Sequence, residues 1–473
     1  MAETDCDIGM IGLGVMGRNL LLNLADHGYG VAGFDTDPAK VEALRAEGGA
    51  RRVCAAASLE AFIGALREPR KIMMLVPAGP PVDNVIAGLL PHLQRGDIVI
   101  DGGNSYFKDT DLRRNMLAER GISYLGLGIS GGERGARSGP SIMPGGCKKA
   151  YERVRALFES VAARAEGQPC IAYMGPGSAG HYVKMVHNGI EYGLMQLIAE
   201  MYDLMKRGLG LSDGRYHDVF AEWNRGDLES FLLEITSHIF CEIDDVTGKR
   251  LVDLILDTAE QKGTGRWSAQ DAMTLGVPVP TLGVAVTMRN LSAMKDERVT
   301  ASEMLGVPAH RYEGDAGAFL EALRHALYCS FVVSYAQGMA LLREASVQYK
   351  YELDFEEIAR TWRGGCIIRS AIVERIRQAF ARQGDLENIM LDPDLAGELR
   401  RREQDWRFVV ATAARLGIPA AAMMASLGYF DAFRSAWLPA NLIQAQRDYF
   451  GAHTFERVDA EGAFHSHWED RCA

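Results

Sequence analysis

The chain has 473 residues, of which 48% are hydrophobic, and its formal net charge at pH 7 is −11. This length is typical of a globular protein with two or three domains, and the acidic balance argues against nucleic acid or an anionic membrane as the main partner. The eight cysteines include no Cys-x-x-Cys pair, which predicts reduced thiols in a cytoplasmic protein without a disulfide framework or a metal site. We also expect no signal peptide and no membrane span.

Strand-like and helix-like segments alternate through the first third of the chain. Short apolar runs that predict buried strands lie at residues 7–14, 31–34, 71–76, 98–101, 124–129 and 171–174. This alternation predicts an α/β domain over residues 1–177, with a parallel, doubly wound, Rossmann-like sheet.

The pattern becomes helical after Gly175-Pro176-Gly177. We predict a large all-α domain over residues 178–435, in which segments 185–205 and 326–345 look alike and suggest an internal duplication. Residues 436–473 mix Pro, Gly, His and aromatic residues. We expect them to form a C-terminal tail that is ordered only when it docks on another surface.

A glycine motif follows the first predicted strand and precedes a helix: Gly12-Leu13-Gly14-Val15-Met16-Gly17. In this context the motif predicts a dinucleotide site, with the pyrophosphate at the helix N-terminus. The alternative is a flexible turn without a ligand.

Acidic residues end the second predicted strand, in Asp35-Thr36-Asp37. A carboxylate at this point accepts the adenosine ribose hydroxyls and repels a 2′-phosphate, so the segment favours NAD over NADP. Asp35 could instead cap the next helix. Lys40, Arg51 or Arg52 could still reach a 2′-phosphate, which leaves NADP as the alternative cofactor.

Two glycine-containing turns follow later strands. Asn104, within Asp101–Ser105, is placed to orient a substrate hydroxyl or the nicotinamide, and Ser130-Gly131-Gly132 offers a hydroxyl and backbone N–H groups to a carboxylate. Either turn alone could be purely structural, but their position at successive strand ends favours a site.

Lys184, Asn188 and Glu191 share one face of a predicted helix, and His187 and Tyr192 flank them. An amine and a carboxyl about 10 Å apart along the axis could act as base and acid on a small substrate. A surface ion pair is a poor alternative, because i,i+7 is too long for the usual helical pair.

Further polar residues suit a phosphate group, although any one of them could be a solvated surface charge. They are Lys262, Thr264, Arg266, Arg289, Arg447 and His453.

Together these motifs resemble the decarboxylating 6-phosphogluconate dehydrogenases over nearly the whole chain. The matching segments are Gly12–Gly17, Asp101–Ser105, Ser130–Arg137, Ser141–Gly146, Lys184–Tyr192, Gln261–Trp267, Trp362–Ser370 and Leu438–Thr454. The resemblance implies a cytoplasmic homodimer of the pentose phosphate pathway, whose C-terminal tail threads into the partner subunit.

The resemblance also implies the chemistry. Lys184 would take the proton of the 3-hydroxyl while hydride passes to the nicotinamide, and Glu191 would protonate the enediol left after loss of carbon dioxide, giving ribulose 5-phosphate. Asn104, Ser130, Gly131, Gly132, His187 and Asn188 would hold the carboxylate and hydroxyls. Tyr192, Lys262, Thr264 and Arg289 would hold the phosphate, with Arg447 and His453 reaching it from the other subunit.

The chain departs from the family pattern mainly at the cofactor end. Asp35-Thr36-Asp37 stands where many members have Asn-Arg-Thr, and Pro77 replaces a common lysine in Val76-Pro77-Ala78, a turn expected along the cofactor. We therefore predict NAD preference. Arg134 stands where a glutamate is usual and has no explanation, while Arg266 replaces a lysine and keeps its charge.

Two alternative functions remain open at this stage. One is a β-hydroxyacid dehydrogenase that acts on an unphosphorylated acid. The other is an NAD-binding protein without catalysis. Retention of Arg289, Arg447 and His453 argues against the first, and retention of Lys184 and Glu191 against the second.

Overall fold

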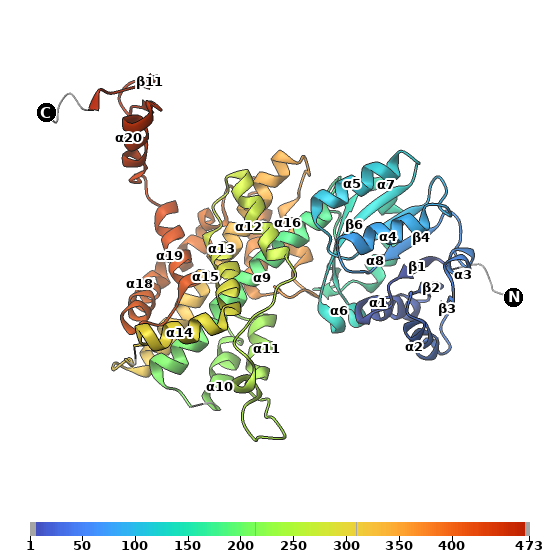
Figure 1. Cartoon of the computed structure of the whole chain (residues 1–473), viewed down its shortest axis with the longest axis horizontal. Helices are drawn as coiled ribbons and strands as arrows, with labels where there is room; N and C mark the ends of the chain where they lie inside the picture. Colours follow the sequence, from blue (N-terminus) through green and yellow to red (C-terminus); the bar gives the residue numbers. More distant parts are fainter. Residues whose placement is uncertain (1–5, 213, 309, 469–473) are drawn as a thin grey trace. The chain divides into compact units, whose positions relative to one another are not determined.

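The structure, a computed structural model, describes residues 6–212, 214–308 and 310–468. By internal packing the chain divides into two compact units, Met1–Ser426 and Leu427–Ala473, which are described separately below (Figure 1). The domain boundaries expected at residues 177 and 435 stay predictions.

A seven-stranded sheet forms the first part of the larger unit, in the order β3-β2-β1-β4-β5-β6-β7. The strands are β1 (Ile8–Ile11), β2 (Val31–Phe34), β3 (Val53–Ala55), β4 (Lys71–Met74), β5 (Ile98–Asp101), β6 (Ser123–Ser130) and β7 (Ser141–Gly146). All neighbouring pairs are parallel except β6 and β7, which are antiparallel. The expected Rossmann-like doubly wound sheet is thus confirmed, with one antiparallel edge strand.

The sequence reading of the strands was wrong at three places. It missed β3 and β7, and residues 171–174 form no strand: Ile171 makes one isolated bridge to Ile142 of β7, and Gly175 makes another to Gly145. Pro144 and two glycines make β7 look like a turn, but an edge strand tolerates a proline because one side of its backbone need not pair with a neighbouring strand.

Helices cover both faces of the sheet (Figure 1). One hydrophobic cluster joins strand residues such as Met10 and Ile100 to α1 (Val15–Asp26), α2 (Pro38–Gly48), α6 (Gly132–Ser138) and α8 (Arg155–Val161). The other joins Ile11 and Val99 to α3 (Leu59–Gly64), α4 (Pro80–Leu89) and α5 (Phe107–Ala118). Successive strand residues enter opposite clusters, as the two-residue period of a strand requires.

The rest of the larger unit is helical, as expected. Its longer helices are α9 (Ala179–Asp203), α12 (Thr264–Leu275), α13 (Pro280–Ala293), α14 (Lys295–Leu305), α15 (Ala316–Gln348), α17 (Ala371–Arg382) and α18 (Pro393–Leu416). Shorter helices are α10 (Gly214–Trp223), α11 (Phe231–Ile239) and α16 (Phe355–Thr361), and α19 (Ala421–Phe433) begins in this unit and continues past its last residue, Ser426. Segment 185–205 covers most of α9 and the first two residues of the π-helix after it, and segment 326–345 falls within α15. Helices α9 and α15 pack against each other, and the duplication stays a hypothesis.

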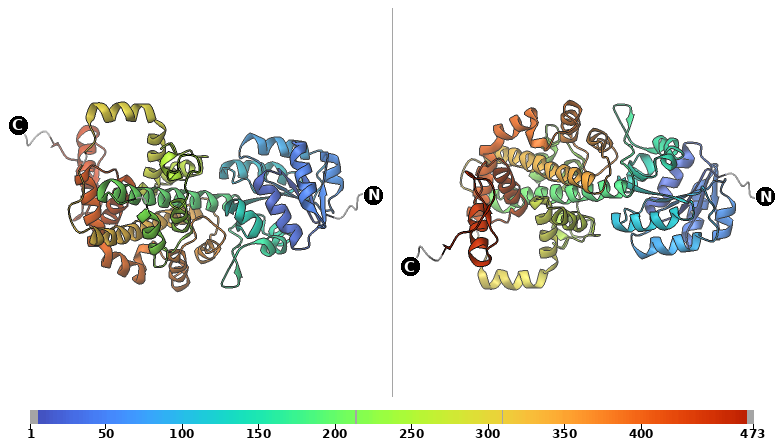
Figure 2. Two further views of the ribbon diagram at one scale, coloured as in Figure 1. Left: turned by 90° about the horizontal axis from the view of Figure 1, so that it is seen from below. Right: turned by 90° about the horizontal axis from the view of Figure 1, so that it is seen from above.

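Helix α9 connects the two parts of this unit. It contacts β6 and β7 of the sheet and α12, α13 and α15 of the helical part, and it leads away from the sheet as the green ribbon of Figure 2. Most of its residues are buried. Side chains on α9 therefore lie where sheet and helices meet.

The smaller unit contains α20 (Ala440–Gly451), β10 (Phe455–Glu456) and β11 (Ala463–Phe464), and the two strands form an antiparallel pair. Asp448 is fully buried at its centre and accepts hydrogen bonds from the Thr454 and Ser466 N–H groups and the Trp468 indole. Desolvation would raise the pKa of Asp448, but the His465 side chain, at 2.9 Å, and these hydrogen bonds outweigh it and keep the pKa low, at about 2. A single carboxylate thus organises the fold of the tail.

Candidate active site

The glycine motif closes a tight turn between β1 and α1. Gly12 has φ +95°, and a Cβ there would lie 2.4 Å from the Leu75 carbonyl oxygen and 3.0 Å from Cγ1 of Val76. A Cβ on Gly17 would lie 1.9 Å from the Gly12 carbonyl oxygen. Both positions therefore require glycine, the first for backbone conformation and close approach and the second for close packing.

Space remains open where a pyrophosphate would sit. A Cβ on Gly14 would meet no atom within 4 Å. Gly14 is the N-cap of α1, and no side chain caps this helix end or places an acid in its first turn. The exposed N–H groups of Val15 and Met16 and the positive end of the helix dipole therefore fit a dinucleotide.

Asp35 is bonded to the glycine turn. One of its oxygens accepts a hydrogen bond from Leu13 N–H at 2.8 Å and the other from Asp37 N–H at 2.9 Å. The cap of α2 is Asp37, which accepts from Ala39 N–H at 3.0 Å. Asp35 is therefore not the helix cap, and each carboxylate oxygen keeps a lone pair for a ribose hydroxyl.

A cavity of about 510 Å³ adjoins Asp35 and Thr36 at the end of β2. Its wall is made by Phe34, Asp35, Thr36, Pro38, Val41, Glu42, Arg45, Ala57, Ser58 and Leu59. The nearby cations already have acidic partners: Lys40 lies 3.6 Å from Asp35, and Arg45 is paired with Glu42. Val76 and Ala78, expected along the cofactor, are half-buried after β4.

The loop after β5 is fixed by Asp101, which is fully buried. Its carboxylate accepts from Gly103 N–H at 2.9 Å and from the Ser105 hydroxyl at 2.6 Å. Asn104 between them has φ +54°, and its side-chain amide exchanges two hydrogen bonds with the backbone of Ile129, at 3.2 and 3.0 Å. The loop therefore holds Asn104 beside the end of β6 with one amide hydrogen still free to donate.

Lys184 is placed by direct contact between α9 and the sheet. A Cβ on Gly128 of β6 would lie 2.3 Å from Cβ of Lys184, and one on Gly180 would lie 2.3 Å from the carbonyl oxygens of Gly126 and Met143. Because Gly128 and Gly180 have no Cβ, α9 can lie directly on the strands. Lys184 is 4% exposed as a result.

A hydrogen-bonded group surrounds the Lys184 amine. Nζ lies 3.2 Å from Nδ1 of His187, and Nδ1 also lies 3.0 Å from Oδ1 of Asn188. On the other side of the imidazole, Nε2 lies 3.3 Å from the Ser130 hydroxyl. Glu191 lies one turn further along α9, 3.8 Å from His187 and with its side chain 20% exposed.

Burial sets the charges of these groups. Desolvation lowers the pKa of Lys184 to about 8, partly opposed by Glu191. Desolvation likewise raises the pKa of Glu191, against the nearby charges of Lys184 and Arg289. The pKa of His187 falls well below its ordinary value because the ring is buried and close to Lys184. The amine can therefore lose a proton near neutrality, and the carboxyl can hold one more readily than usual.

Residues expected to hold a phosphate converge on the same helix. Asn188 donates to the Thr264 hydroxyl at 3.1 Å, and Thr264 begins α12 at an end without a side-chain cap. The Arg289 guanidinium lies 3.5 Å above the Tyr192 ring. Lys262 is exposed just before α12. The N-terminus of α12 and two cations thus offer anion-binding groups near α9.

Ser130-Gly131-Gly132 leads from β6 into α6. The Ser130 hydroxyl accepts from Ile367 N–H at 3.4 Å, and a Cβ on Gly131 would lie 2.6 Å from the Gly365 carbonyl oxygen. Gly132 has open space around it. Residues 362–370 therefore form one wall of the site, and the family motif Trp362–Ser370 is the sequence signal for them.

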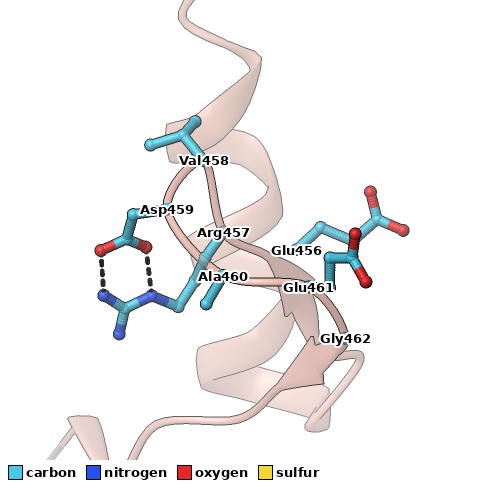
Figure 3. A pocket seen from close by; sticks show the side chains of 7 residues that line it. All are labelled: Glu456, Arg457, Val458, Asp459, Ala460, Glu461 and Gly462. Atoms are coloured by element: carbon cyan, nitrogen blue, oxygen red, sulfur yellow. Dashed lines mark hydrogen bonds and ion pairs between the residues drawn. The ribbon is translucent and has the colours of Figure 1, made fainter.

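Arg447 and His453 lie in the smaller unit, where both are exposed. Arg447 donates to Gln444 at 3.0 Å. Figure 3 shows the hollow at the turn 456–462 of this unit, where Arg457 is paired with Asp459 and the side chains point outward. Neither predicted residue lines that hollow.

Models of two 6-phosphogluconate dehydrogenase domains match the chain. The NAD binding domain matches residues 7–175, and the C-terminal domain matches residues 180–468. The 6-phosphogluconate dehydrogenase, NADP(+)-dependent, decarboxylating, of Bacillus subtilis is 50% identical over 462 residues, covering 98% of each chain. The chain belongs to the decarboxylating 6-phosphogluconate dehydrogenase family.

Other members of this family agree. The decarboxylating 6-phosphogluconate dehydrogenase of Synechococcus elongatus is 51% identical over 466 residues, covering 97% of this chain and 98% of that one. The structure of Plasmodium falciparum 6-phosphogluconate dehydrogenase, described in apo form and with NADP+ and 6-phosphogluconate, superposes with a TM-score of 0.95 at 43% identity. That match covers 98% of this chain and all of the other.

Two arginines depart from the family pattern on exposed helix positions. Arg134 is exposed on α6 and Arg266 is exposed on α12, and nothing in the structure explains Arg134.

Among the described residues, no cluster of three or more His, Cys, Asp or Glu side chains is arranged to hold a metal ion. No helix in the described ranges is long and apolar enough to cross a membrane.

Proposed function

We propose that this protein catalyses oxidative decarboxylation of 6-phospho-D-gluconate to D-ribulose 5-phosphate and carbon dioxide, and that it prefers NAD to NADP. The observation that carries the proposal is the buried amine of Lys184, hydrogen-bonded to His187 and followed along α9 by Glu191. The Plasmodium relative's description with 6-phosphogluconate supports the choice of substrate.

Lys184 acts first, as the general base. Its pKa of about 8 leaves a useful neutral fraction near neutrality, and the neutral amine takes the proton of the substrate's 3-hydroxyl. A dinucleotide held by its pyrophosphate at the glycine turn would supply a nicotinamide as the hydride acceptor for C3. The substrate is then a 3-keto acid with its carboxylate one carbon from the ketone.

Decarboxylation and protonation follow. The protonated Lys184 amine donates to the 3-keto oxygen, which accepts the electron pair released when the C1–C2 bond breaks and carbon dioxide leaves. Glu191, whose pKa is raised by burial, then delivers a proton to the carbon that lost the carboxylate, while Lys184 takes back the proton of the C3 hydroxyl so that the ketone re-forms. His187 and Asn188 keep the amine in place during these steps.

The substrate's anionic ends are held on opposite sides of Lys184. Asn104, Ser130 and the backbone of Gly131 and Gly132 face the carboxylate end. At the other end Tyr192, Lys262, Thr264 and Arg289 serve the phosphate, with the uncapped N-terminus of α12 adding N–H donors.

The preference for NAD follows from charge at the adenosine end. A 2′-phosphate at the ribose would lie against the Asp35 carboxylate, with Asp37 and Glu42 close by. Lys40 and Arg45, the cations beside the cavity, are already paired with acids. Each 1.4 kcal/mol of such repulsion changes the preference about tenfold. This would distinguish the enzyme from the Bacillus relative that is named as NADP(+)-dependent.

We also propose a homodimer with shared active sites. Helix α14 has no buried residue, and Val299, Met304 and Leu305 on it are exposed; it lies at the edge of the helical part (yellow in Figure 2). Helix α20 exposes Leu442, Ile443 and other large apolar residues. Apolar surface of this kind favours burial against a second copy, which would bring Arg447 and His453 to the partner's phosphate site.

The proposal is tested by initial rates with 6-phosphogluconate, using NAD and NADP in parallel over a concentration series. We expect turnover with both and a higher kcat/KM with NAD. An equal or higher kcat/KM with NADP would reject the cofactor preference alone. Reduction of neither cofactor would reject the reaction.

Lys184→Met should lower kcat by at least about 100-fold while NAD still binds, and near-normal turnover would reject Lys184 as the base.

A further inference from the structure

The segment Trp362–Ile367 follows α16 and lines the site, although the mechanism above gives it no task. We propose that Trp362 is a positioning residue for the catalytic base: its indole fixes the ring of His187, and through that ring the amine of Lys184. The inference rests on the proposed role of Lys184 as the base.

The contact between the two rings is direct. The His187 and Trp362 rings meet edge to face, with centroids 5.7 Å apart and planes at 77°. Both side chains are fully buried, at 0% exposure. An edge-to-face pair resists rotation of either ring, because rotation would lose the packing and the favourable quadrupole geometry.

The orientation of the His187 ring matters because both of its nitrogen atoms are engaged. Nε2 faces the Ser130 hydroxyl at 3.3 Å, and Nδ1 faces the Lys184 amine at 3.2 Å. A tilt of the ring would lengthen both contacts at once. The Lys184 amine is therefore held in place only as firmly as the imidazole is.

Trp362 is itself anchored to the sheet. Its indole N–H donates to the sulfur of Met143 on β7 at 3.4 Å, and its backbone N–H donates to Ile358 and Ala359 of α16 at 3.2 and 3.1 Å. A chain of contacts thus runs from β7 through Trp362 and His187 to Lys184.

The same segment reaches the site at two more points. The Gly365 carbonyl accepts from Ser141 N–H at 2.9 Å, and Ile367 N–H donates to the Ser130 hydroxyl at 3.4 Å. The segment therefore holds the imidazole through the Trp362 ring and, at its Nε2 side, through Ser130.

Loss of this contact has a predictable effect on the charge of Lys184. The groups that act on its amine are His187 and Glu191 on α9 and Cys366 on the segment, while Arg289 on α13 acts on Glu191. None is removed when Trp362 is replaced. Water entering the vacated space would therefore be the main change, and it would favour the charged amine.

The test compares Trp362→Leu with the wild-type enzyme in kcat, KM and pH dependence. We expect kcat to fall about 10- to 100-fold, with KM for NAD unchanged. The acid limb of the kcat/KM profile should move to higher pH by about one unit, because the pKa of Lys184 rises. Trp406→Phe, at an equally buried tryptophan of α18, should change Tm without moving the limb. A lower Tm for Trp362→Leu with an unmoved limb would overturn the inference.

A double-mutant cycle covers the case in which Trp362→Leu fails to fold. Trp362→Phe keeps a ring but removes the N–H donor, and Met143→Leu removes its sulfur acceptor. If this bond positions the base, the double variant should lose no more kcat than the worse single variant. Additive losses would overturn the inference.

A readout independent of turnover separates this inference from the proposed function. Competitive labelling with acetic anhydride at several pH values, read by peptide mass spectrometry, reports the fraction of neutral Lys184 amine. The labelling midpoint should move to higher pH in Trp362→Leu. An unmoved midpoint rejects the positioning role, whereas a moved midpoint in an enzyme that does not turn over 6-phosphogluconate rejects only the proposed reaction.

Discussion

The Asp35 carboxylate accepts a hydrogen bond from the backbone N–H of Leu13 at 2.8 Å. This bond ties the end of β2 to the glycine turn after β1, two segments that parallel pairing places side by side. The carboxylate is 10% exposed and cannot swing away from an incoming ribose without breaking the bond. The negative charge that we propose to favour NAD is therefore bonded to the glycine turn itself.

We expect Asp35→Asn combined with Thr36→Arg to raise the ratio of kcat/KM for NADP to that for NAD by at least about tenfold, since removing about 1.4 kcal/mol of repulsion suffices. The substitution removes an anion and supplies a bidentate phosphate donor. The measurement is initial rates with both cofactors. Asp385→Asn, on an exposed loop, is the control for loss of one negative charge elsewhere and should leave the ratio unchanged. An unchanged ratio in the double variant would contradict the proposed preference for NAD.

The pH dependence should report Lys184. The base must be neutral, so kcat/KM should fall as pH drops below its pKa of about 8. The ionised Glu191 carboxylate raises that pKa, and removing its charge should lower it. In Glu191→Gln the acid limb of the residual activity should therefore move to lower pH, and a shift to higher pH would be inconsistent with the proposed pair.

Gly128→Ala should damage the site through packing. The new methyl group would lie 2.3 Å from Cβ of Lys184, so α9 must move off the strand. We expect kcat to fall about 100-fold and unfolding free energy to drop by about 1–3 kcal/mol, measured by steady-state rates and urea titration. Gly88→Ala on α4, whose Cβ would have only Leu59 nearby at 3.8 Å, is the control. Full activity of Gly128→Ala would disprove this account of how Lys184 is placed.

Mixed dimers can test the shared site. Lys184→Met lacks the base, and Arg447→Ala lacks the cation expected from the partner. After both variants are unfolded and refolded together at equal amounts, about half of the dimers are mixed and one of their two sites is intact, so about a quarter of wild-type activity should return. No recovery, in the presence of mixed dimers confirmed by native mass spectrometry, would contradict sites shared between subunits.

Glu200 should stabilise the start of α19. It is 2% exposed and accepts hydrogen bonds from Ala422 and Met423 N–H at 2.8 and 2.9 Å. Glu200→Ala leaves both donors unpaired in a buried place, and we expect a loss of about 1–3 kcal/mol in unfolding free energy. Urea titration measures it, with Glu344→Ala on the exposed side of α15 as control. A loss of unfolding free energy equal to that of the control would mean that water accepts the hydrogen bonds of Ala422 and Met423 N–H in place of the carboxylate.

Local patterns determined part of this protein from the sequence alone. The glycine turn and the acid after β2 are short local motifs. Lys184, Asn188 and Glu191 share one face because they lie within about two turns of the same helix. Strand and helix periods also gave the α/β and all-α parts. The strands missed were the short β3 and the proline-containing edge strand β7, whose place in the sheet depends on pairing rather than on local composition.

Only the tertiary structure decided what surrounds Lys184. Its burial depends on Gly128, 56 positions earlier, and its hydrogen-bonded neighbours are held by Ser130 and by Trp362. These groups meet because α9 lies on the glycines of β6 and β7 and because the segment after α16 folds back onto the sheet. Desolvation is a property of this packed arrangement and not of any local spacing. The role that the resemblance implies for Lys184 calls for a lowered pKa, but only the packed structure shows the burial that lowers it.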